Sequence, residues 1–383
     1  MLVHHGSERP RDAQAFEDLD LVIVSYATLR IDQEIFQQRE WKVLMLDEAQ
    51  SIKNPGSQSF KAVKTLKSRH RFTLTGTPLE NSVIDLWAQF DFLEPGLLGS
   101  VQRFKKRFGS RGADSPDPER MRLQRIVRPF MLRRTKDAVE KSLPPKEEVR
   151  LFAEMGTRQR AAYDALKDGY RRRIAAALRE KGIAGSGALI FEGLLRLRQA
   201  ACIPEHANPS LKDVPAAKLE LLEDVLEEIV AEGHRVLVFS QFVQTLKVIS
   251  GMLDHRQVPY AYLDGSTRNR QQVIDRFQAD PGVPLFLLSL KAGGLGINLT
   301  AADYVVIFDP WWNPAVERQA VDRSHRIGQK KPVFVYRLIT RESIEERILT
   351  LQDQKRALAA ELIEENPRSL LSLGEEELIG FFS

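Results

Sequence analysis

Two adjacent carboxylates in this chain have the arrangement needed to handle a metal-bound phosphate. Asp47 and Glu48 directly follow the apolar run 43–46, which predicts a β-strand. An open α/β sheet places ligand groups at the carboxyl edge of its strands. There, one carboxylate could hold Mg²⁺, usually through water, while the other orients an attacking water molecule. The alternative is an acidic pair that caps the following helix.

A second apolar strand, 71–74, ends in the turn Thr75-Gly76-Thr77-Pro78. Threonine hydroxyls beside a Gly-Pro turn could sense the state of a magnesium-bound phosphate. The alternative is an ordinary turn, because glycine and proline are common in loops of every kind. By themselves, these four residues do not distinguish the two interpretations.

A glycine-rich segment, 289–300, follows a further apolar strand at 285–288. Glycine lets the backbone approach a ligand closely, and exposed N–H groups can then face phosphate oxygens. The ligand could be a nucleotide or the backbone of a nucleic acid, and a plain glycine-rich turn is the alternative. Lys291 and Asn298 favour a phosphate contact.

Two arginines near the end of the chain are spaced for action on phosphate. Arg323 and Arg326 are three residues apart, so on a helix they would share one face. Guanidinium groups can stabilise the charge on a γ-phosphoryl group during its transfer, an effect of about 10³–10⁵ in rate. The alternative is a surface salt-bridge face formed with Glu317 and Asp322.

A phosphate-binding loop of the G-x-x-x-x-G-K-[ST] type is absent from the sequence, and none of the 23 glycines is followed by lysine. Such a loop uses its lysine to contact the β- and γ-phosphates and its hydroxyl to bind Mg²⁺. The sequence therefore contains most of the residues expected of an ATP site, without its phosphate cradle.

Length and composition indicate a globular protein with more than one domain. The 383 residues allow two or three domains with separate cores, and 43% hydrophobic residues exclude wholesale disorder. A formal charge of +4 permits a polyanionic partner without predicting one. The basic residues are concentrated in three stretches, which are either solvated helix faces or contacts for such a partner. These stretches are 103–107, 128–136 and 171–173.

Several kinds of site are disfavoured by the sequence. A single cysteine, Cys202, rules out an internal disulfide and suits a reducing cytosol. The seven histidines show no ligand spacing, so we expect no zinc site. No apolar run approaches the roughly 20 residues needed to span a bilayer, and the first residues lack a signal-peptide layout. We therefore expect a cytoplasmic protein with no membrane partner.

Short apolar runs alternate with helical stretches, a pattern typical of parallel α/β sheets with helices on both faces. The runs are 21–24, 43–46, 71–74, 236–239, 285–288, 304–308 and 333–336. The stretch between the two groups has few strand signals, so we interpret it as helical insertions. A buried helical stripe at 218–232, followed by Gly233, marks the entry to the second group.

We therefore predict an α/β fold with two parallel-sheet lobes, the first of them truncated, and helical insertions between them. The predicted ranges are 1–84 for the remainder of the first lobe, 85–215 for the insertions and linker, 216–340 for the second lobe and 341–383 for a C-terminal helical brace.

The chain resembles the SWI/SNF family of helicase-like ATPases, within the superfamily-two helicases, almost from end to end. The resemblance is carried by blocks in the family's order, and the D-E-A-Q form is most similar to its prokaryotic branch. The blocks are 20–30, 47–54 (D-E-A-Q-S-I-K-N), 74–81 (L-T-G-T-P-L-E-N), 130–135 (F-M-L-R-R-T), 309–314 (D-P-W-W-N-P) and 319–329 (Q-A-V-D-R-S-H-R-I-G-Q).

The resemblance implies two RecA-like lobes and a DNA-dependent ATPase that uses ATP and Mg²⁺, moves along duplex DNA and need not separate the strands. It implies that Asp47 holds Mg²⁺ and that Glu48 activates water. The other residues implied to contact the nucleotide are Gln50, Thr75, Thr77, Gly296, Gln319, Asp322, Arg323 and Arg326. Those implied to contact DNA are Lys53, Arg133, Arg134, Lys291, Gly294, Asn298 and Trp312. The resemblance also implies a nucleoid-associated protein and leaves open a DNA-bound protein substrate.

One departure from the family is severe. The family's adenine-binding and P-loop motifs are expected upstream of residue 1, in a longer parent or in a separate polypeptide. We therefore expect this chain alone to bind ATP poorly and to hydrolyse it at the background rate. Two other interpretations stay open: a non-catalytic DNA-binding or regulatory fragment, and a strand-separating helicase once the chain is completed.

Overall fold

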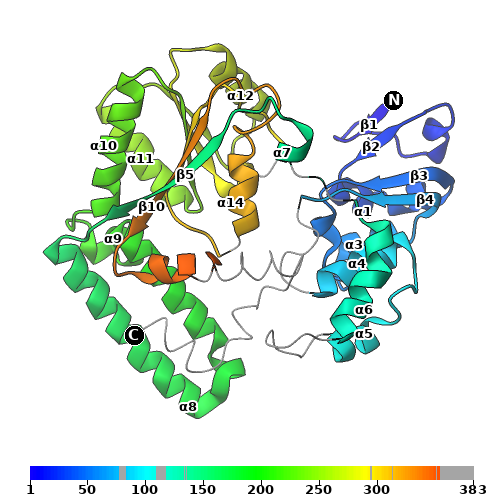
Figure 1. Ribbon diagram of the computed structural model, residues 1–383, viewed down its shortest axis with the longest axis horizontal. Helices are drawn as coiled ribbons and strands as arrows, with labels where there is room; N and C mark the ends of the chain where they lie inside the picture. The colour runs from blue at the N-terminus through cyan, green and yellow to red at the C-terminus, as the bar shows by residue number, and fades with distance from the viewer. Residues whose placement is uncertain are drawn as a thin grey trace. The chain divides into compact units, whose positions relative to one another are not determined.

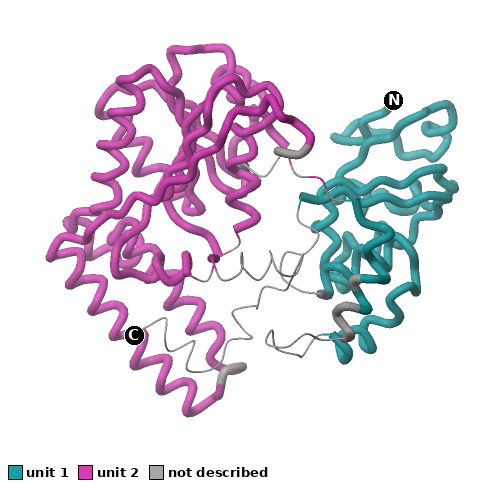
Figure 2. The backbone as a smooth tube through the Cα atoms, viewed as in Figure 1, with its two compact units in different colours: residues 1–132, 357–369 teal, residues 133–356, 370–383 magenta. Residues whose placement is uncertain are grey.

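The computed structural model describes residues 1–76, 83–108, 118–132, 134, 136–293, 296–312, 314–350 and 352–353. The described residues divide into two compact units: those up to residue 132 belong to unit 1, and those from 134 to 353 belong to unit 2 (Figure 2). Each unit is described by itself. No helix in the described part of the chain is both long enough and apolar enough to cross a membrane.

Unit 1 contains two pairs of parallel strands and a set of helices (Figure 1). Strand β1 pairs with β2, and β3 pairs with β4. The strands are β1 (Leu2–His4), β2 (Val22–Val24), β3 (Glu40–Leu46) and β4 (Lys67–Thr73). The helices are η1 (Ala13–Phe16), α1 (Tyr26–Ile31), α2 (Gln33–Gln37), η2 (Ala49–Ile52), α3 (Gln58–Lys64), α4 (Val83–Leu93), α5 (Val101–Phe108), α6 (Pro118–Val127) and η3 (Arg128–Phe130).

One apolar core holds unit 1 together. Leu46 of β3 packs in it with Phe60 of α3, Phe92 of α4 and Phe104 of α5. Helices α4, α5 and α6 fall in the range predicted for the insertions, yet they share this core with the strands. Their apolar side chains explain this, because burying aromatic residues of α4 and α5 and aliphatic residues of α6 in the same core removes a large apolar area from water.

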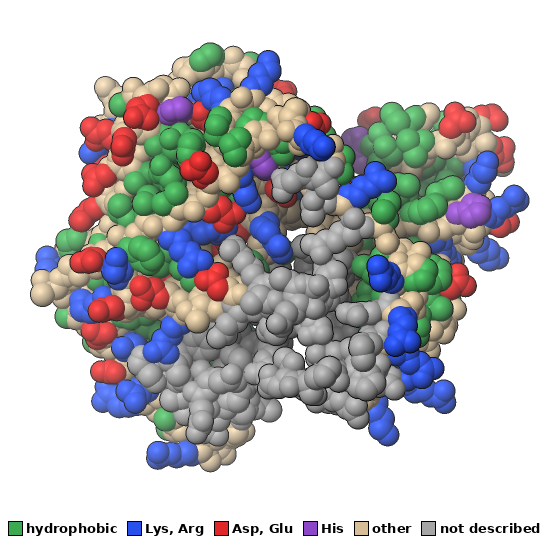
Figure 3. Space-filling view, viewed as in Figure 1, with side chains coloured by type: hydrophobic (Ala, Val, Ile, Leu, Met, Phe, Trp, Pro, Cys, Tyr) green, Lys and Arg blue, Asp and Glu red, His purple; other side chains and the backbone are tan. Residues whose placement is uncertain are grey.

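We predicted that helices cover both faces of the sheet, but the opposite face of the unit 1 strands is exposed. Met45 of β3 is 58% exposed and its register partner on β4, Phe72, is 51% exposed. Residues on alternate positions of a strand share one face, so the exposed apolar side chains of β3 and β4 lie together. Val3 of β1 is the register partner of Ile23 of β2, and both are exposed as well. We call this set the bare face, and Figure 3 shows hydrophobic side chains gathered over these strands. Its members are Val3, Ile23, Val43, Met45, Phe72 and Leu74.

Unit 2 is built around six parallel strands in the order β5-β10-β9-β6-β8-β7. The strands are β5 (Lys146–Ala153), β6 (Val236–Ser240), β7 (Tyr260–Leu263), β8 (Leu285–Ser289), β9 (Tyr304–Ile307) and β10 (Val333–Thr340). The helices are α7 (Lys136–Val139), α8 (Thr157–Cys202), α9 (Pro204–Ala207), η4 (Pro209–Leu211), α10 (Ala217–Ala231), α11 (Val243–His255), α12 (Arg270–Ala279), α13 (Leu290–Gly293) and α14 (Pro314–Val321).

Both faces of this second sheet are covered, as the continuous apolar runs predict. Alternate residues of one strand belong to different cores: Leu237 and Phe239 of β6 pack with helices α12 and α14, whereas Val236 and Val238 pack with α10 and α11. All five residues of β6 are buried. The predicted α/β fold with a parallel sheet is therefore confirmed.

Two features of unit 2 come from the stretch where few strands were expected. Strand β5 pairs in parallel with β10 along its whole length and forms one edge of the sheet. It carries charged residues because an edge strand faces solvent, and this hid its apolar pattern. Helix α8 is interrupted at Gly182, whose positive φ of 63° breaks the helical backbone.

The bare face makes a prediction about stability. Replacing Phe72 by threonine should change the free energy of unfolding by less than about 1 kcal/mol, because little burial is lost and a β-branched residue suits a strand. Replacing Phe92 by alanine should cost about 3–5 kcal/mol, because this side chain is completely buried. Urea-induced unfolding of the two variants measures both effects. Equal losses would show that the bare face is covered.

Candidate nucleotide and nucleic-acid sites

The acidic pair lies in a tight turn at the carboxyl end of β3, where the sequence placed it. Glu48 has the left-handed backbone conformation, with φ 48° and ψ 52°, which is uncommon for a residue with a side chain. Its N–H donates to Asp47 Oδ1 at 2.9 Å. The next residue ties this turn to the end of β4, since Ala49 N–H donates to Leu74 O at 3.0 Å. The turn is therefore fixed by both strands.

A chain of hydrogen bonds joins the acidic turn to the threonine turn. Gln50 Nε2 donates to Glu48 Oε2 at 2.7 Å, and Thr75 Oγ1 donates to Gln50 Oε1 at 3.0 Å. The amide orientation follows from this network, because its nitrogen faces the carboxylate and its oxygen faces the hydroxyl. Three of the predicted site residues are thus brought together within unit 1. Lys53, one turn further along, is half-buried.

The acidic pair fits a magnesium ion held partly by other ligands. Asp47 is exposed and offers carboxylate oxygens, the donors that Mg²⁺ prefers. In the described residues there is no group of three or more His, Cys, Asp or Glu that could hold a metal ion. Mg²⁺ is usually bound through one or two carboxylates together with water and phosphate oxygens. The pair matches that mode and does not match an all-protein metal cage.

Tyr26 also supports this turn, and sequence analysis did not find its role. Its hydroxyl donates to Asp47 O at 2.8 Å across a separation of 21 residues. Burial, with the nearby charges of Asp47 and Glu48, raises the pKa of Tyr26, so the hydroxyl stays protonated and remains a donor. Tyr26 lies in the block 20–30, but no spacing rule connects it with the acidic pair.

In unit 2, the glycine-rich segment lies against the arginine block. Leu299 N–H donates to Arg323 O at 2.9 Å, and Ser324 Oγ donates to Ala302 O at 2.5 Å. Gln329 Nε2 donates to the same Ala302 O at 2.8 Å. Gly296 has a positive φ of 65°, a conformation that a side chain would strain. Two stretches that are separate in the sequence are therefore brought side by side.

The two arginines do not share a helical face, so that prediction is wrong. Helix α14 ends at Val321, and the residues that follow form turns. Arg323 is 7% exposed, whereas Arg326 is exposed. Hydrogen bonds to the neighbouring segment 299–302 replace the next helical turn, and a spacing rule cannot anticipate them. Gln319 is half-buried on α14 itself.

The acidic residues near these arginines form ion pairs with Arg337 and Lys136. Glu317 is completely buried and ion-paired with Arg337 of β10. Asp322 forms an ion pair with Lys136 of α7, in which Oδ1 and Nζ are 2.7 Å apart. The same Nζ donates a hydrogen bond to His325 O at 2.9 Å. Helix α7 thus fixes the arginine block from the side. Sequence analysis placed Asp322 beside the nucleotide, and here its carboxylate contacts Lys136.

The residues predicted to contact DNA are dispersed over several elements. Lys291 on α13 and Asn298 in the following loop are both exposed, and Arg134 is exposed at the start of unit 2. Trp312 is half-buried, with its ring centroid 6.0 Å from the guanidinium carbon of Arg198. Three residues predicted to contact the nucleotide or DNA lie outside the described part of the chain. These are Thr77, Arg133 and Gly294.

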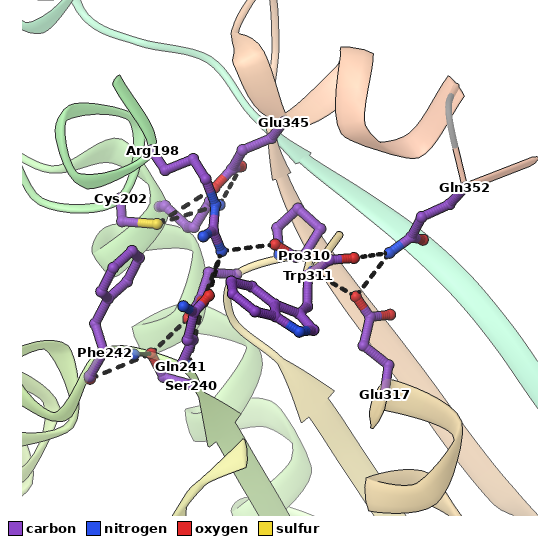
Figure 4. A network of polar contacts seen from close by, with 12 residues as sticks. Arg198, Cys202, Ser240, Gln241, Phe242, Pro310, Trp311, Glu317, Glu345 and Gln352 are labelled. Carbon is purple, nitrogen blue, oxygen red and sulfur yellow. Dashed lines mark hydrogen bonds and ion pairs between the residues drawn. The ribbon is translucent and has the colours of Figure 1, made fainter. Parts of the chain in front are cut away.

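The segment 309–312 is surrounded by buried charged groups (Figure 4). Asp309 is completely buried and accepts hydrogen bonds from Ser240 Oγ at 2.5 Å and from Gln241 N at 3.2 Å. Arg198 of α8 is 2% exposed, and its Nη2 lies 3.5 Å from Asp309 Oδ2. Sequence analysis did not single out Arg198, because an isolated arginine on a long helix has no distinguishing pattern.

The sequence comparisons give two domain families that cover most of the chain. Residues 1–206 match the SNF2-related domain and residues 217–328 match the helicase conserved C-terminal domain. The putative ATP-dependent helicase/translocase YwqA of Bacillus subtilis is 36% identical over 398 residues, covering 100% of this chain and 42% of the relative. The ISWI chromatin-remodeling complex ATPase ISW1 of Saccharomyces cerevisiae is 37% identical over 367 residues, covering 92% of this chain and 32% of the relative.

Solved structures agree with these matches. The Sulfolobus solfataricus SWI2/SNF2 ATPase core in complex with dsDNA has a TM-score of 0.50 and 36% identity, covering 98% of this chain and 79% of that chain. Parallel α/β units with helicase-type blocks at their strand ends define the class as helicase-like ATPases. The chain belongs to the SWI/SNF family of ATP-dependent helicases and translocases. It spans 42% and 32% of the length of the two relatives named above.

Asp309 makes stability depend on pH. Burial raises the pKa of this carboxyl from 3.8 to about 6, although Arg198 and Ser240 act in the opposite direction. The folded protein therefore keeps a proton that the unfolded chain releases in this range. The group's contribution to the free energy of unfolding falls as pH rises from 3.8 to about 6, and it is constant above that.

We predict that the unaltered chain loses roughly 3 kcal/mol across this window relative to the variant Asp309→Asn, which has no carboxyl to titrate. Urea-induced unfolding of both proteins at several pH values measures the difference. A difference that stays constant with pH would contradict the account.

Proposed function

We propose that this chain forms the larger part of an ATP-driven motor that moves along duplex DNA. In this proposal the acidic turn of unit 1 and the arginine block of unit 2 act on one ATP molecule. Asp47 holds Mg²⁺, which would neutralise phosphate charge when bound, and Glu48 accepts a proton from the attacking water. Gln319, Arg323 and Arg326 contact the phosphates.

The observation that carries the proposal is the hydrogen-bond chain Glu48–Gln50–Thr75. It connects the carboxylate that would activate water with a hydroxyl at the end of the neighbouring strand. A change at the phosphates that moved Glu48 would therefore also move Thr75. Such a connection is what a motor needs in order to convert hydrolysis into a change of shape. An acidic pair that merely capped a helix would not need it.

The nucleic-acid part of the proposal rests on unit 2. Lys291 and Asn298 are both exposed within the glycine-rich segment, which suits contact with a phosphate backbone. A similar solved structure is an ATPase core in complex with dsDNA. Duplex DNA is therefore the partner that we propose, with backbone contacts that do not depend on base sequence.

We also propose that the chain alone does not turn over ATP. The sequence has no G-x-x-x-x-G-K-[ST] loop to bind the β- and γ-phosphates. The bare face of unit 1 supports the same conclusion, because parallel sheets are normally covered by helices on both faces. A further segment with a strand, a phosphate-binding loop and a helix would supply both missing features.

The missing loop also favours a second candidate function, a DNA-binding fragment without catalysis. The two candidates agree that the isolated chain is inactive, and they differ in what completion does. Joining the chain to a P-loop segment should restore turnover in a motor and should not do so in a fragment whose site has no catalytic use.

ATP turnover tests the inactivity of the isolated chain. The isolated chain with duplex DNA and Mg²⁺ should release phosphate at the rate of the buffer alone, because the β- and γ-phosphates have no cradle. A fusion that adds the P-loop segment of an ATP-dependent relative should hydrolyse ATP. Robust turnover by the isolated chain would refute the inactivity proposal, and an inert fusion that binds ATP would favour the non-catalytic fragment.

Duplex binding tests the proposed DNA contacts. Lys291→Ala and Arg134→Ala should each weaken duplex binding uniformly across sequences, and each should reduce the slope of log K against log salt by about 1. Fluorescence anisotropy over a salt series measures both effects. Lys247→Ala, which removes an exposed lysine from α11, is the matched control and should leave the slope unchanged. Unchanged affinity in the first two variants would count against the proposed contacts.

A further inference from the structure

The segment 309–312 has no regular secondary structure, yet its backbone is held in place by side chains. Pro310 O accepts a hydrogen bond from Arg198 Nη2 at 2.9 Å. Trp311 N–H donates to Glu317 Oε1 at 2.6 Å, and Trp311 O accepts from Gln352 Nε2. Figure 4 shows these three side chains converging on the segment from different parts of unit 2.

Arg198 holds the segment from one side. Besides Pro310 O, its Nη2 donates to Gln241 Oε1 at 2.7 Å and lies 3.5 Å from Asp309 Oδ2. Three aromatic rings surround the same guanidinium. Its carbon lies 5.1 Å from the ring centroid of Phe242, 5.0 Å from that of Trp311 and 6.0 Å from that of Trp312.

Glu317 holds the segment from the other side. This carboxylate is completely buried on α14, contacts Arg337 of β10 and accepts from Gln352 Nε2 at 2.9 Å. It lies two residues before Gln319, a predicted nucleotide contact. Arg198 near the end of α8 and Glu317 on α14 therefore hold the segment 309–312 between them.

We propose that Arg198 is a positioning residue for DNA binding: it holds the segment 309–312, and with it Trp312, in the arrangement that contacts duplex DNA. The inference rests on the proposed function and on the DNA contact that the family resemblance implies for Trp312. A buried guanidinium is suited to this task because its planar, rigid donors can bind several acceptors while its faces stack on aromatic rings. A lysine in the same place keeps the charge but loses that geometry.

A purely structural role for Arg198 is the competing explanation, because removing one partner from a buried ion pair destabilises any fold. The two roles differ in how Arg198 relates to Trp312. A positioning residue acts through the tryptophan, so substitutions at the two sites should not be additive in DNA affinity. A residue that only stabilises the fold has no such coupling.

The test is a double-mutant cycle on the full chain. Arg198→Lys, Trp312→Ala and the double variant are titrated with a short fluorescein-labelled DNA duplex, well below their melting temperatures. We expect each single variant to bind about tenfold more weakly and the double variant to bind no more weakly than Trp312→Ala. Full additivity of the two losses would overturn the proposal.

Lys218→Met is the matched control for stability. Lys218 is also completely buried and ion-paired, with Glu345, and it contacts Cys202 and the Phe308 ring. Within the described residues it makes no hydrogen bond or ion pair with the segment 309–312 and acts on Asp309 only through its charge. It should lower the melting temperature, as Arg198→Lys does, and should leave DNA affinity within about twofold of the unaltered chain. A tenfold loss in this control would assign the effect of Arg198→Lys to stability and would overturn the proposal.

Gln241→Met provides a second variant if Arg198→Lys does not fold. It removes an acceptor of Arg198 at a half-buried position, so we expect a smaller loss of affinity that is again absent in the Trp312→Ala background. An equal loss in both backgrounds would contradict positioning through Trp312. If the unaltered chain bound no duplex at any salt concentration, the proposed function would fail, and the role of Arg198 would fail with it.

Discussion

Parallel strand pairing decides where the candidate functional residues of this chain lie. Every strand pair in the described residues is parallel, so neighbouring strands end at the same edge of a sheet. In unit 1, that edge carries Asp47 after β3 and Thr75 after β4. In unit 2, it carries Lys291 after β8 and Asp309 after β9. Turns at these ends place polar groups at the edge where open α/β sheets generally bind their ligands.

The two units differ in how completely their strands are covered. The unit 2 sheet has helices on both faces, and its central strands are fully buried. The unit 1 strands are covered on one face, and large apolar side chains are exposed on the other. Large exposed apolar patches mark surfaces that contact something else. On the proposal that a further strand-loop-helix segment supplies the phosphate-binding loop, the same segment would also cover the bare face.

Sequence patterns predicted the parts of the structure that depend on local periodicity. The strand at 236–239, the helix at 218–232 and the αL glycine at Gly233 were all found, because continuous apolar runs and helical stripes report burial directly. Strand β5 was missed because its edge position favours charged residues. The prediction that Arg323 and Arg326 share one helical face was wrong, because hydrogen bonds to the segment 299–302 hold these residues in turns. Tyr26 and Arg198 were missed because their contacts cross 21 and 112 residues, which no spacing rule covers.

The most direct measurement is DNA-stimulated phosphate release by the completed protein carrying Glu48→Gln and Arg323→Lys, singly and together. If both side chains act on the same ATP molecule, each single variant should lose most of the rate and the double variant should be no worse than the poorer single one. The account would be contradicted if the loss in the double variant equalled the product of the two single losses. It would also be contradicted if either substitution left the rate of the completed protein unchanged.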